Sequence, residues 1–562
     1  MKIVRIVLCT LMALAMIFSL IACNKDNGQP GDQGNNQETN QSGQGNSQGD
    51  SQGDNQGGNQ GSGQSGGGES GIPKSITIGV SGYLGRFYSG EMPVACWSAC
   101  DAVFDTVFYA NRETGEVFSY VLDEWYYEDE LTFIMKLKPG IYFSNGEEAT
   151  AEDLLYSYYS HEERGSVVRS AMGSVNFQES SVLDKYTVSF KFDRPYLSFD
   201  KVIAFLICKS WAQEVGWDSE KWYEPVGSGP YYVAEYSADD HITLRLRDDY
   251  WNKDRDDYAV EEWIIKYFPT GSTMFMELER GTISMCAVES ADYSRFINEG
   301  ADNIDILLQD MGVVVWFGMG QLDTPALRDK SVRLALAHGV NWEQVGKVGY
   351  EDRFIPTNSI FPTASPFYYN PGTHEFNPDL AVQILADAGY GPGDITLSIL
   401  AMDRPIYRNC LESFQYFCSE IGINVELSFG DVSSVLADWI VPGGSDGGIM
   451  YNIDGAVAYD PVASCLAEYN GLESTRWTYI DDAKLLEMTD NAIYCPDKDL
   501  QKELLVEVQQ YIFDEVMLIP FAASVSTPGY RTDVFTENQI KTNVFHDQYV
   551  WLSNLGRASA WN

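Results

Sequence analysis

The sequence predicts a mixed α/β body behind an N-terminal stretch that cannot form a core. Roughly 490 of the 562 residues follow that stretch, enough for two or three domains. Hydrophobic residues make up 44% of the chain and aromatic residues 13%, so this body can bury ample apolar surface. Along it, period-two strand patterns alternate with turn signals and helix caps, which is typical of an α/β fold.

The body opens with an alternating strand, Ser75–Val80, and a second strand is expected over Leu131–Leu137. Pro139-Gly140 fits the central positions of a type II turn, because Pro fixes φ and Gly accepts a positive φ. Ile141–Phe143 predicts a further short strand, and Asn145-Gly146 a further turn.

The sequence predicts where two helices begin and, for the second, where it ends. Thr150–Asp153 is similar to a capping box, in which the Thr150 hydroxyl caps early amides and a carboxylate stands at the third helical position. In the second helix, Asn377 is the expected N-cap, Pro378 the first helical residue and Gly389 the stop. Its predicted apolar face comprises Leu380, Ile384, Leu385 and Ala388.

Gly227-Ser228-Gly229 is predicted to be structural. A phosphate-binding loop needs a helix N-terminus directly after its glycines. Here Pro230 fits a turn and Tyr231–Val233 has the pattern of a strand.

The chain is strongly acidic, with 37 Lys and Arg against 81 Asp and Glu and a formal net charge of −44. Lys2 and Arg5 lie in a segment that we expect to be removed, which leaves 35 basic residues and a charge of −46. Such a charge repels phosphate backbones and anionic headgroups, so it disfavours nucleic-acid binding and direct docking of the body on a membrane.

Residues 1–22 have the features of a lipoprotein signal peptide. Lys2 and Arg5 precede the apolar run Ile6–Ile21, which is shorter than the about 20 residues of a transmembrane span. Leu20-Ile21-Ala22-Cys23 resembles the bacterial lipobox, in which the chain is cut before the cysteine and its thiol is diacylated. We therefore expect lipidation of Cys23 and a location on the extracellular face of the bacterial cell membrane. The alternative is an ordinary signal peptide with a chance cysteine.

Residues 23–74 are expected to form a linker. Asn24–Gly71 consists almost wholly of Gly, Gln, Asn, Ser and Asp and has no aromatic or aliphatic side chain. It therefore cannot offset its ordering entropy, and as a flexible coil it would reach roughly 35–42 Å. A prion-like assembly segment is the alternative, but such segments interleave Tyr or Phe.

The cysteines predict buried thiols and no metal site. Eight lie in the body, at positions 96, 100, 208, 286, 410, 418, 465 and 495. None forms Cys-x-x-Cys, and no histidine lies within ligand spacing of a pair. Their even number permits disulfides without demonstrating them.

The order of segments along the body resembles the family 5 extracellular solute-binding proteins, the receptors of oligopeptide, dipeptide and nickel ABC importers. The segments that carry the resemblance are Thr114–Val117, Trp125, Leu131–Phe133, Leu137–Phe143, Asn145-Gly146, Thr150–Leu154, Asp184–Phe190, Pro225–Tyr231, Leu278–Ile283, Arg328–Ala337, Asn377–Tyr390 and Ile421–Leu427. Their order extends the resemblance over residues 75–550.

The resemblance implies a bilobal periplasmic-binding-protein-like fold, with mixed sheets in each lobe, a hinge of two crossover segments and an extra small domain. On this pattern domain I comprises residues 75–115, 222–325 and 518–562, domain II residues 116–221, and domain III residues 326–517. The implied function is a monomeric receptor that closes on a small solute and delivers it to an ABC importer permease. Such a receptor needs no cofactor and catalyses nothing.

The resemblance also selects candidate ligand residues. In peptide-binding members, an aspartate four residues before a proline pairs with the peptide ammonium. In the matching stretch, Val457 stands four residues before Pro461, and Asp454 or Asp460 could replace the missing carboxylate. A buried ammonium without such a partner would be costly. A peptide is therefore the first expectation, and a sugar or another non-peptide solute is the alternative.

Four aromatic residues are candidates for the walls of the ligand site: Tyr83 after the first strand, Trp316 before the lobe crossover, and Tyr451 and Tyr459 around the altered loop. Aromatic walls bind sugar faces and peptide side chains equally well. Aromatic residues of this kind lie more often in a core than against a ligand, so each of the four has the core as its alternative.

Two other function classes stay open as alternatives, an exported carbohydrate-active enzyme and a surface adhesin. The chain has five histidines and neither His-Glu-x-x-His nor a Gly-x-Ser-x-Gly before a helix. Carboxylate pairs are so common in an acidic chain that counting them does not test for a glycosidase pair.

Overall fold

The computed structural model describes most of the body. The described residues are 73–81, 84–87, 97–110, 116–164, 172–202, 204–252, 258–320, 325–351, 353–363, 365–430, 435, 447–451, 482–546, 549–550 and 552–561. The predicted signal peptide, Cys23 and the linker lie outside them. Among the described helices, none is long and apolar enough to cross a membrane.

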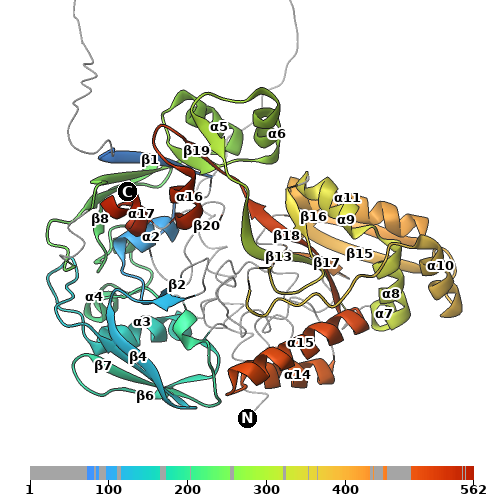
Figure 1. Ribbon diagram of the computed structural model, residues 1–562, viewed down its shortest axis with the longest axis horizontal. Helices are drawn as coiled ribbons and strands as arrows, with labels where there is room; N and C mark the ends of the chain where they lie inside the picture. The colour runs from blue at the N-terminus through green and yellow to red at the C-terminus, as the bar shows by residue number, and fades with distance from the viewer. Residues whose placement is uncertain are drawn as a thin grey trace, which may run out of the picture. The chain divides into compact units, whose positions relative to one another are not determined.

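A seven-stranded mixed sheet contains the first strand of the body (Figure 1). Its order is β12 (Ile304–Ile306), β19 (Pro528–Arg531), β11 (Met285–Ala287), β1 (Ser75–Val80), β10 (Glu262–Tyr267), β9 (His241–Leu246) and β8 (Tyr231–Ser237). The predicted strand Ser75–Val80 is confirmed, and it runs parallel to both of its neighbours, β10 and β11. Trp263 and Tyr231 are buried in the core of this sheet.

Short elements surround this sheet. They are α2 (Trp97–Val103), α4 (Lys209–Val215), α5 (Gly271–Arg280), α6 (Ser290–Glu299), α16 (Glu537–Asn543), β20 (Val544–His546), β21 (Tyr549–Val550) and α17 (Leu552–Leu555). Helix α2 packs against β8, β9 and α17, and α5 packs against β11 and β19.

A four-stranded antiparallel sheet follows α2 in the chain, with the small hairpin β2 (Tyr109–Ala110) and β3 (Val117–Phe118) in between. Its order is β4 (Leu122–Asp129), β5 (Thr132–Leu137), β7 (Thr187–Phe192) and β6 (Val175–Val182). Helix α3 (Ala151–Arg164) covers it, and Tyr158 of α3 packs edge-on against Phe190 of β7, with ring centroids 5.2 Å apart.

Two local expectations in this region need correction. Ile141–Phe143 is not a strand, because only Tyr142 pairs, in an isolated bridge to Glu148. The Thr150 hydroxyl donates to the Asp153 carboxylate at 2.9 Å instead of accepting from an amide. The reciprocal half of the box is formed, since Thr150 N donates to the same carboxylate at 2.9 Å. The turn at Gly140 is confirmed by its φ of +82°.

A second group of sheets follows β12 in the chain. The four-stranded sheet has the order β14 (Phe354–Pro356), β18 (Leu518–Ser526), β13 (Gln309–Met319) and β17 (Gly447–Tyr451), and β15 (Ile395–Met402) pairs in parallel with β16 (Ile423–Gly430). The helices are α7 (Pro325–Arg328), α8 (Lys330–Gly339), α9 (Trp342–Tyr350), α10 (Pro378–Asp387), α11 (Pro405–Glu420), α14 (Ala483–Ile493) and α15 (Lys498–Glu515).

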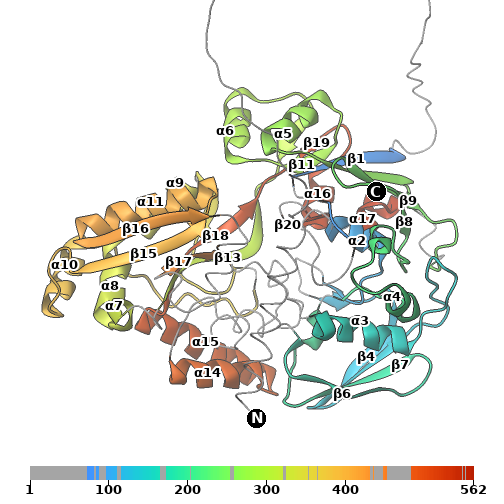
Figure 2. The same ribbon diagram turned by 180° about the vertical axis from the view of Figure 1, so that it is seen from behind.

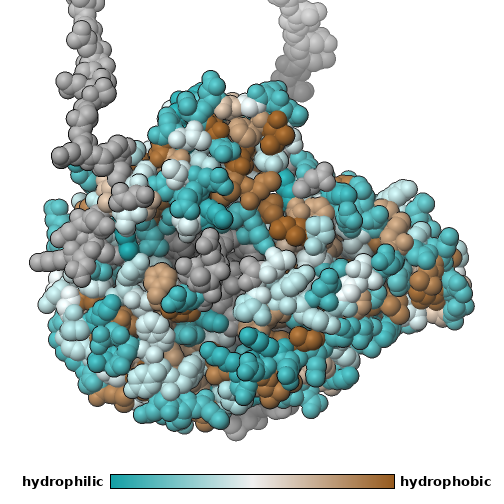
Figure 3. Space-filling model, in the orientation of Figure 1, coloured by the Kyte–Doolittle hydropathy of each residue, from teal (hydrophilic) through white to brown (hydrophobic). Residues whose placement is uncertain are grey.

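Helix α10 has the predicted ends but a different buried face. The Asn377 side chain accepts from Leu380 N, Pro378 is the first helical residue, and Gly389 follows with φ +90°. The helix buries Ala381 and Leu385 against α8, whereas Leu380 and Ala388 are exposed. The exposed apolar side chains of α10 are visible among hydrophilic ones at the right-hand end of Figure 3.

We call residues 75–306 and 528–561 the first lobe and residues 309–526 the second lobe, because sheet membership changes between them. The cysteines that the structure describes in the body are all buried thiols. They are Cys100, Cys208, Cys286, Cys410, Cys418 and Cys495.

Candidate functional site

The chain passes between the two lobes at two places that lie side by side. Strand β12 ends at Ile306 and β13 begins at Gln309, whereas β18 ends at Ser526 and β19 begins at Pro528. Leu307 N donates to Pro528 O at 3.1 Å, and Gln309 is the register partner of Ser526. Both views show β13 and β18 running together from the first lobe into the second (Figures 1 and 2).

One of the two crossings is anchored to the first lobe. The Thr527 hydroxyl donates to Val288 O at 2.6 Å, and Val288 N donates to Thr527 O at 3.0 Å. On the second-lobe side, the pairing of β13 with β18 shifts register between Asp310 and Val313. Because such irregularities bend a strand, the change of direction falls just beyond the anchored Thr527.

The predicted domain boundaries at 325/326 and 517/518 do not coincide with the two crossings, and the division into three domains stays a prediction. The boundaries at 325/326 and 517/518 would leave both β13 and β18 in domain I. In the structure, both strands hydrogen-bond within the sheet that also contains β14 and β17.

Trp316 lies in the middle of β13 and is fully buried. Its neighbour Phe317 stacks on Phe414 of α11, with ring centroids 4.5 Å apart, so the alternation of β13 directs Trp316 to the other face of the sheet. A Cβ on Gly318 would lie 2.7 Å from the Trp316 ring, so glycine at this position leaves room for the indole.

The structure places one other candidate beside Trp316. Tyr451 is the last residue of β17 and is paired with Val315 of β13, so the segments that contain Trp316 and Tyr451 are neighbouring strands. Tyr83, Asp454, Tyr459 and Asp460 lie outside the described residues. A ligand-binding role for the six candidates stays a prediction.

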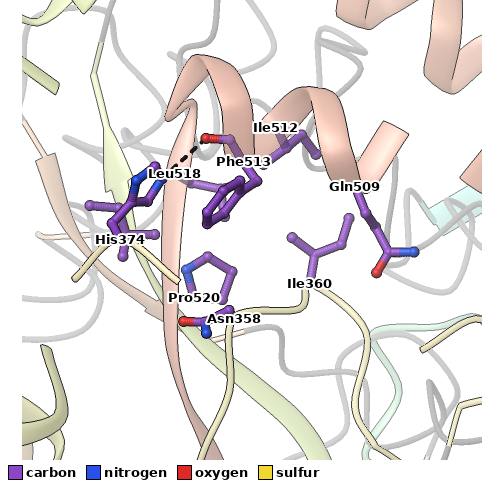
Figure 4. Close-up of a pocket in the computed structure, with 9 residues that line it drawn as sticks. Asn358, Ile360, His374, Gln509, Ile512, Phe513, Leu518 and Pro520 are labelled. Carbon is purple, nitrogen blue, oxygen red and sulfur yellow. Dashed lines mark hydrogen bonds between the residues drawn. The ribbon is translucent and has the colours of Figure 1, made fainter. Parts of the chain in front are cut away.

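A small cavity lies in the second lobe between α15, the start of β18 and the loop that leads to His374 (Figure 4). Pro520, the register partner of Trp316, is one of its lining residues. The His374 ring stacks on Phe513 of α15 at 4.1 Å, and its Nε2 lies 3.3 Å from Phe513 O. Burial lowers the pKa of His374, which keeps the imidazole neutral.

The polar groups of this cavity already have protein partners. Asn358 donates to the Thr373 hydroxyl at 2.9 Å. Gln509 accepts from the Ser359 hydroxyl at 2.9 Å and donates to Phe367 O at 3.0 Å. The cavity is therefore suited to packing rather than to holding a charged solute. Among the described residues, no group of three or more His, Cys, Asp and Glu side chains could hold a metal ion.

A larger, more open pocket lies in the first lobe, and Arg247 is one of its lining residues. The buried guanidinium donates to Gly227 O at 3.2 Å and to Gly229 O at 3.1 Å. A Cβ at Gly227 would lie 2.1 Å from Val103 O, and one at Gly229 would lie 2.6 Å from Ala102 O. Close backbone packing therefore requires both glycines. The strand predicted after them is confirmed as β8.

The sequence reasoning missed a contact between the lobes at Arg194. Its Nη1 lies 2.7 Å from the Asp490 carboxylate, 296 positions along the chain. Neither residue belongs to a motif or a periodic pattern, so no signal in a single sequence could have paired them.

A comparison with models of protein families establishes the family to which the chain belongs. The family model described as bacterial extracellular solute-binding proteins, family 5 middle, matches residues 119–445, more than half of the chain. The chain belongs to family 5 of the bacterial extracellular solute-binding proteins. The resemblance predicted from the order of segments is thereby confirmed.

Curated relatives of this family 5 protein include transport receptors. An ABC transporter peptide-binding protein of Brucella ovis is 25% identical over 313 residues, which are 53% of this chain and 57% of that protein. The chain thus spans less than two thirds of the length of that relative. The dipeptide-binding protein of Escherichia coli is 21% identical over 465 residues, 75% of this chain and 83% of that protein.

Solved structures confirm the predicted bilobal α/β fold of the family 5 protein. A peptide-binding protein AppA from Clostridium difficile aligns with a TM-score of 0.73 at 17% identity, over 86% of this chain and 99% of that one. DppA from Helicobacter pylori, in complex with the peptide STSA, aligns with a TM-score of 0.71 at 18% identity, over 85% of this chain and 97% of that one. NikZ from Campylobacter jejuni, in complex with Ni(L-His), aligns with a TM-score of 0.71 at 16% identity, over 86% of this chain and 99% of that one.

Proposed function

We propose that this family 5 protein is a receptor that captures a small peptide between its two lobes and delivers it to the permease of an ABC importer. The observation that carries the proposal is the pair of adjacent crossings at 307–308 and at 527. These two neighbouring segments connect the lobes. Two adjacent connections between two bodies form a hinge, and a hinge permits the bodies to close around a ligand.

The choice of solute is supported by the relatives. The names of the Brucella ovis and Escherichia coli relatives specify peptides, and one structural neighbour is a peptide complex. The neighbour with Ni(L-His) shows that the same fold also holds a metal chelate of a single amino acid. A peptide remains the proposal for this chain, with contacts from Trp316, Tyr451 and the loop that contains Asp454, Tyr459 and Asp460.

We also propose that the protein is attached to the extracellular face of the membrane through a lipid on Cys23. The lipobox-like sequence Leu20–Cys23 supports this attachment. Two acyl chains on one thioether supply stable anchoring, since each buried methylene contributes about 0.8 kcal/mol. The protein then acts without a cofactor and without catalysis, as expected of a receptor.

The test is to purify the protein under native conditions and identify co-purified small molecules by mass spectrometry. Peptides should be recovered, and a synthetic peptide of the identified composition should rebind in calorimetry. Recovery of a sugar or a nickel chelate alone would replace the peptide proposal. Turnover of a glycan from a test panel would support an enzyme instead of a receptor.

A further inference from the structure

Arg194, Asp490 and Tyr494 form a contact between the lobes, which we call the Arg194 contact. Arg194 Nη1 lies 2.7 Å from Asp490 Oδ1, and Nη2 lies 3.5 Å from the main-chain oxygen of Asp490. The guanidinium also stands over the Tyr494 ring, 3.8 Å from its centroid. One side chain therefore makes an ion pair and a cation–π contact with the same helix end.

The first lobe holds Arg194 in place through its backbone. Arg194 follows β7, and the Ser174 hydroxyl both donates to Arg194 O at 2.6 Å and accepts from Arg194 N at 3.1 Å. The small sheet that carries Arg194 is itself bonded to the rest of the first lobe, because Ser144 N donates to Gly227 O at 2.8 Å. The position of Arg194 therefore follows the first lobe.

The partners of Arg194 belong to the second lobe. Asp490 lies in the last turn of α14, and Tyr494 follows that helix as its C-cap. Helix α14 packs on α15, which in turn packs on β18. A cation near the C-terminus of a helix is stabilised by the helix dipole as well as by the carboxylate.

Two further observations place the lobes in contact around this point. Burial raises the pKa of Asp200 in the first lobe, and the nearby charge of Lys498 on α15 opposes that rise. A continuous cluster of buried apolar side chains includes Phe190 and Phe199 of the first lobe and Leu505 and Val508 of the second. None of the hinge strands β12, β13, β18 and β19 supplies a residue to the Arg194 contact.

We propose that the Arg194 contact is a latch, which forms when the lobes close and breaks when they open, and so sets the stability of the closed form. This inference rests on the proposed function, in which the lobes move about the two crossings. Rotation at 307–308 and 527 separates Arg194 from α14, because the three residues are attached to different lobes and to no hinge strand.

The chain offers a matched control within one lobe. Arg408 lies 2.6 Å from the Asp403 carboxylate and 4.0 Å from the centroid of the Phe429 ring. The Arg408 and Asp403 side chains are 40% and 61% exposed, and those of Arg194 and Asp490 are 42% and 44% exposed. The two arginines are thus alike in chemistry and exposure, whereas the partners of Arg408 lie in its own lobe and those of Arg194 lie in the other lobe.

The first experiment needs no solute. Small-angle X-ray scattering and hydrogen exchange compare the solute-free wild type with Arg194→Ala, Asp490→Asn, Tyr494→Leu and Arg408→Ala. The three latch variants should have a larger radius of gyration and faster exchange at the end of α14, and Arg408→Ala should match the wild type. In about 1 M NaCl, where the Debye length is about 3 Å, the wild type should move toward the variants.

If the folded latch variants and Arg408→Ala give the same scattering and exchange, the latch is refuted. Should Arg194→Ala fail to fold, the Asp490 and Tyr494 variants decide the outcome, since each removes one half of the contact and retains the arginine.

The second experiment separates the latch from the proposed function. An equimolar mixture of synthetic tripeptides is bound, and its release is followed by stopped-flow tryptophan fluorescence. Release from Arg194→Ala should be roughly 3- to 30-fold faster than from the wild type and from Arg408→Ala. Changed scattering without any tripeptide binding would keep the latch and reject the peptide function. Equal release from all proteins would reject the latch and keep the function.

Discussion

Replacement of Gly227 by alanine tests whether the Gly-Ser-Gly segment is structural. The new Cβ would lie 2.1 Å from Val103 O and 2.8 Å from Val103 Cγ1. Atoms this close must separate, and the nearest one is a backbone oxygen at the end of α2 that cannot rotate away. The segment would have to move, which pulls Gly227 O from its 3.2 Å contact with Arg247.

The size of the effect follows from these two losses. Overpacking costs about 1–3 kcal/mol, and a hydrogen bond from a charged donor contributes about 1.5–3 kcal/mol. Gly227→Ala should therefore lower the free energy of unfolding by about 3–5 kcal/mol, a large part of the 5–15 kcal/mol typical of a domain. Urea denaturation followed by circular dichroism measures it.

Gly391→Ala is the control for Gly227→Ala. Its Cβ would meet only the end of the Asp394 side chain, at 3.2 Å, and Gly391 is not among the positive-φ glycines. Its unfolding free energy should stay within about 1 kcal/mol of the wild type. The structural reasoning fails if the two variants unfold alike, and it also fails if the wild type binds inorganic phosphate and a stable Gly227→Ala does not.

Three other predictions concern the anchor and acid stability. Cys23→Ser should release a folded protein from the membrane fraction and abolish palmitate labelling, and a mutant that stays in that fraction would refute lipidation at Cys23. Burial lowers the pKa of His161 to about 3, so stability present above pH 6.5 is lost as the pH falls toward 3. At pH 5 that loss is about 2 kcal/mol, and His161→Gln should remove it in urea titrations that compare neutral pH with pH 5. The hydrogen bond from Lys185, the larger cause, and one from Tyr186 lower the pKa of Glu148 to about 2. Glu148→Gln should cost about 1 kcal/mol at neutral pH, and because the stabilisation is lost as the pH falls from 4.5 through 2, the variant should equal the wild type there.

Features set by a few adjacent residues could be predicted from the sequence. The strand Ser75–Val80 follows from side-chain alternation, and the turn at Gly140 follows from its positive φ. The ends of α10 follow from the capping side chain of Asn377 and from the positive φ of Gly389. Each of these causes acts within a handful of positions, so the surrounding fold does not change the result.

Features set by the fold could not be predicted in the same way. The buried face of α10 is rotated toward Ala381 because α8 lies there, and a Cβ on Gly339 of α8 would lie 3.1 Å from Ala381 Cβ. The Thr150 hydroxyl could bond to a main-chain amide or to a nearby carboxylate, and in the structure it donates to the carboxylate of Asp153. The Arg194 contact joins residues 296 positions apart, and only the packing of the two lobes against each other brings them together.

The same distinction between local features and features set by the fold applies to the candidate site. The family resemblance selected Trp316 and Tyr451 as candidates, and these two residues lie on the neighbouring strands β13 and β17. It could not predict that Trp316 is fully buried, because its burial depends on what packs on that face of the sheet.

The two adjacent crossings also make the second lobe an inserted module within the first. Gln309 and Ser526 are register partners, so the 309–526 segment starts and ends at one point of the structure. Leu307 N already bonds to Pro528 O, and a linker of a few glycines could therefore join the chain across the gap. Insertion and excision are tolerated best where the two ends meet in this way. Exchange of the second lobe between relatives therefore needs two neighbouring joints, with the apolar cluster that both lobes share kept matched.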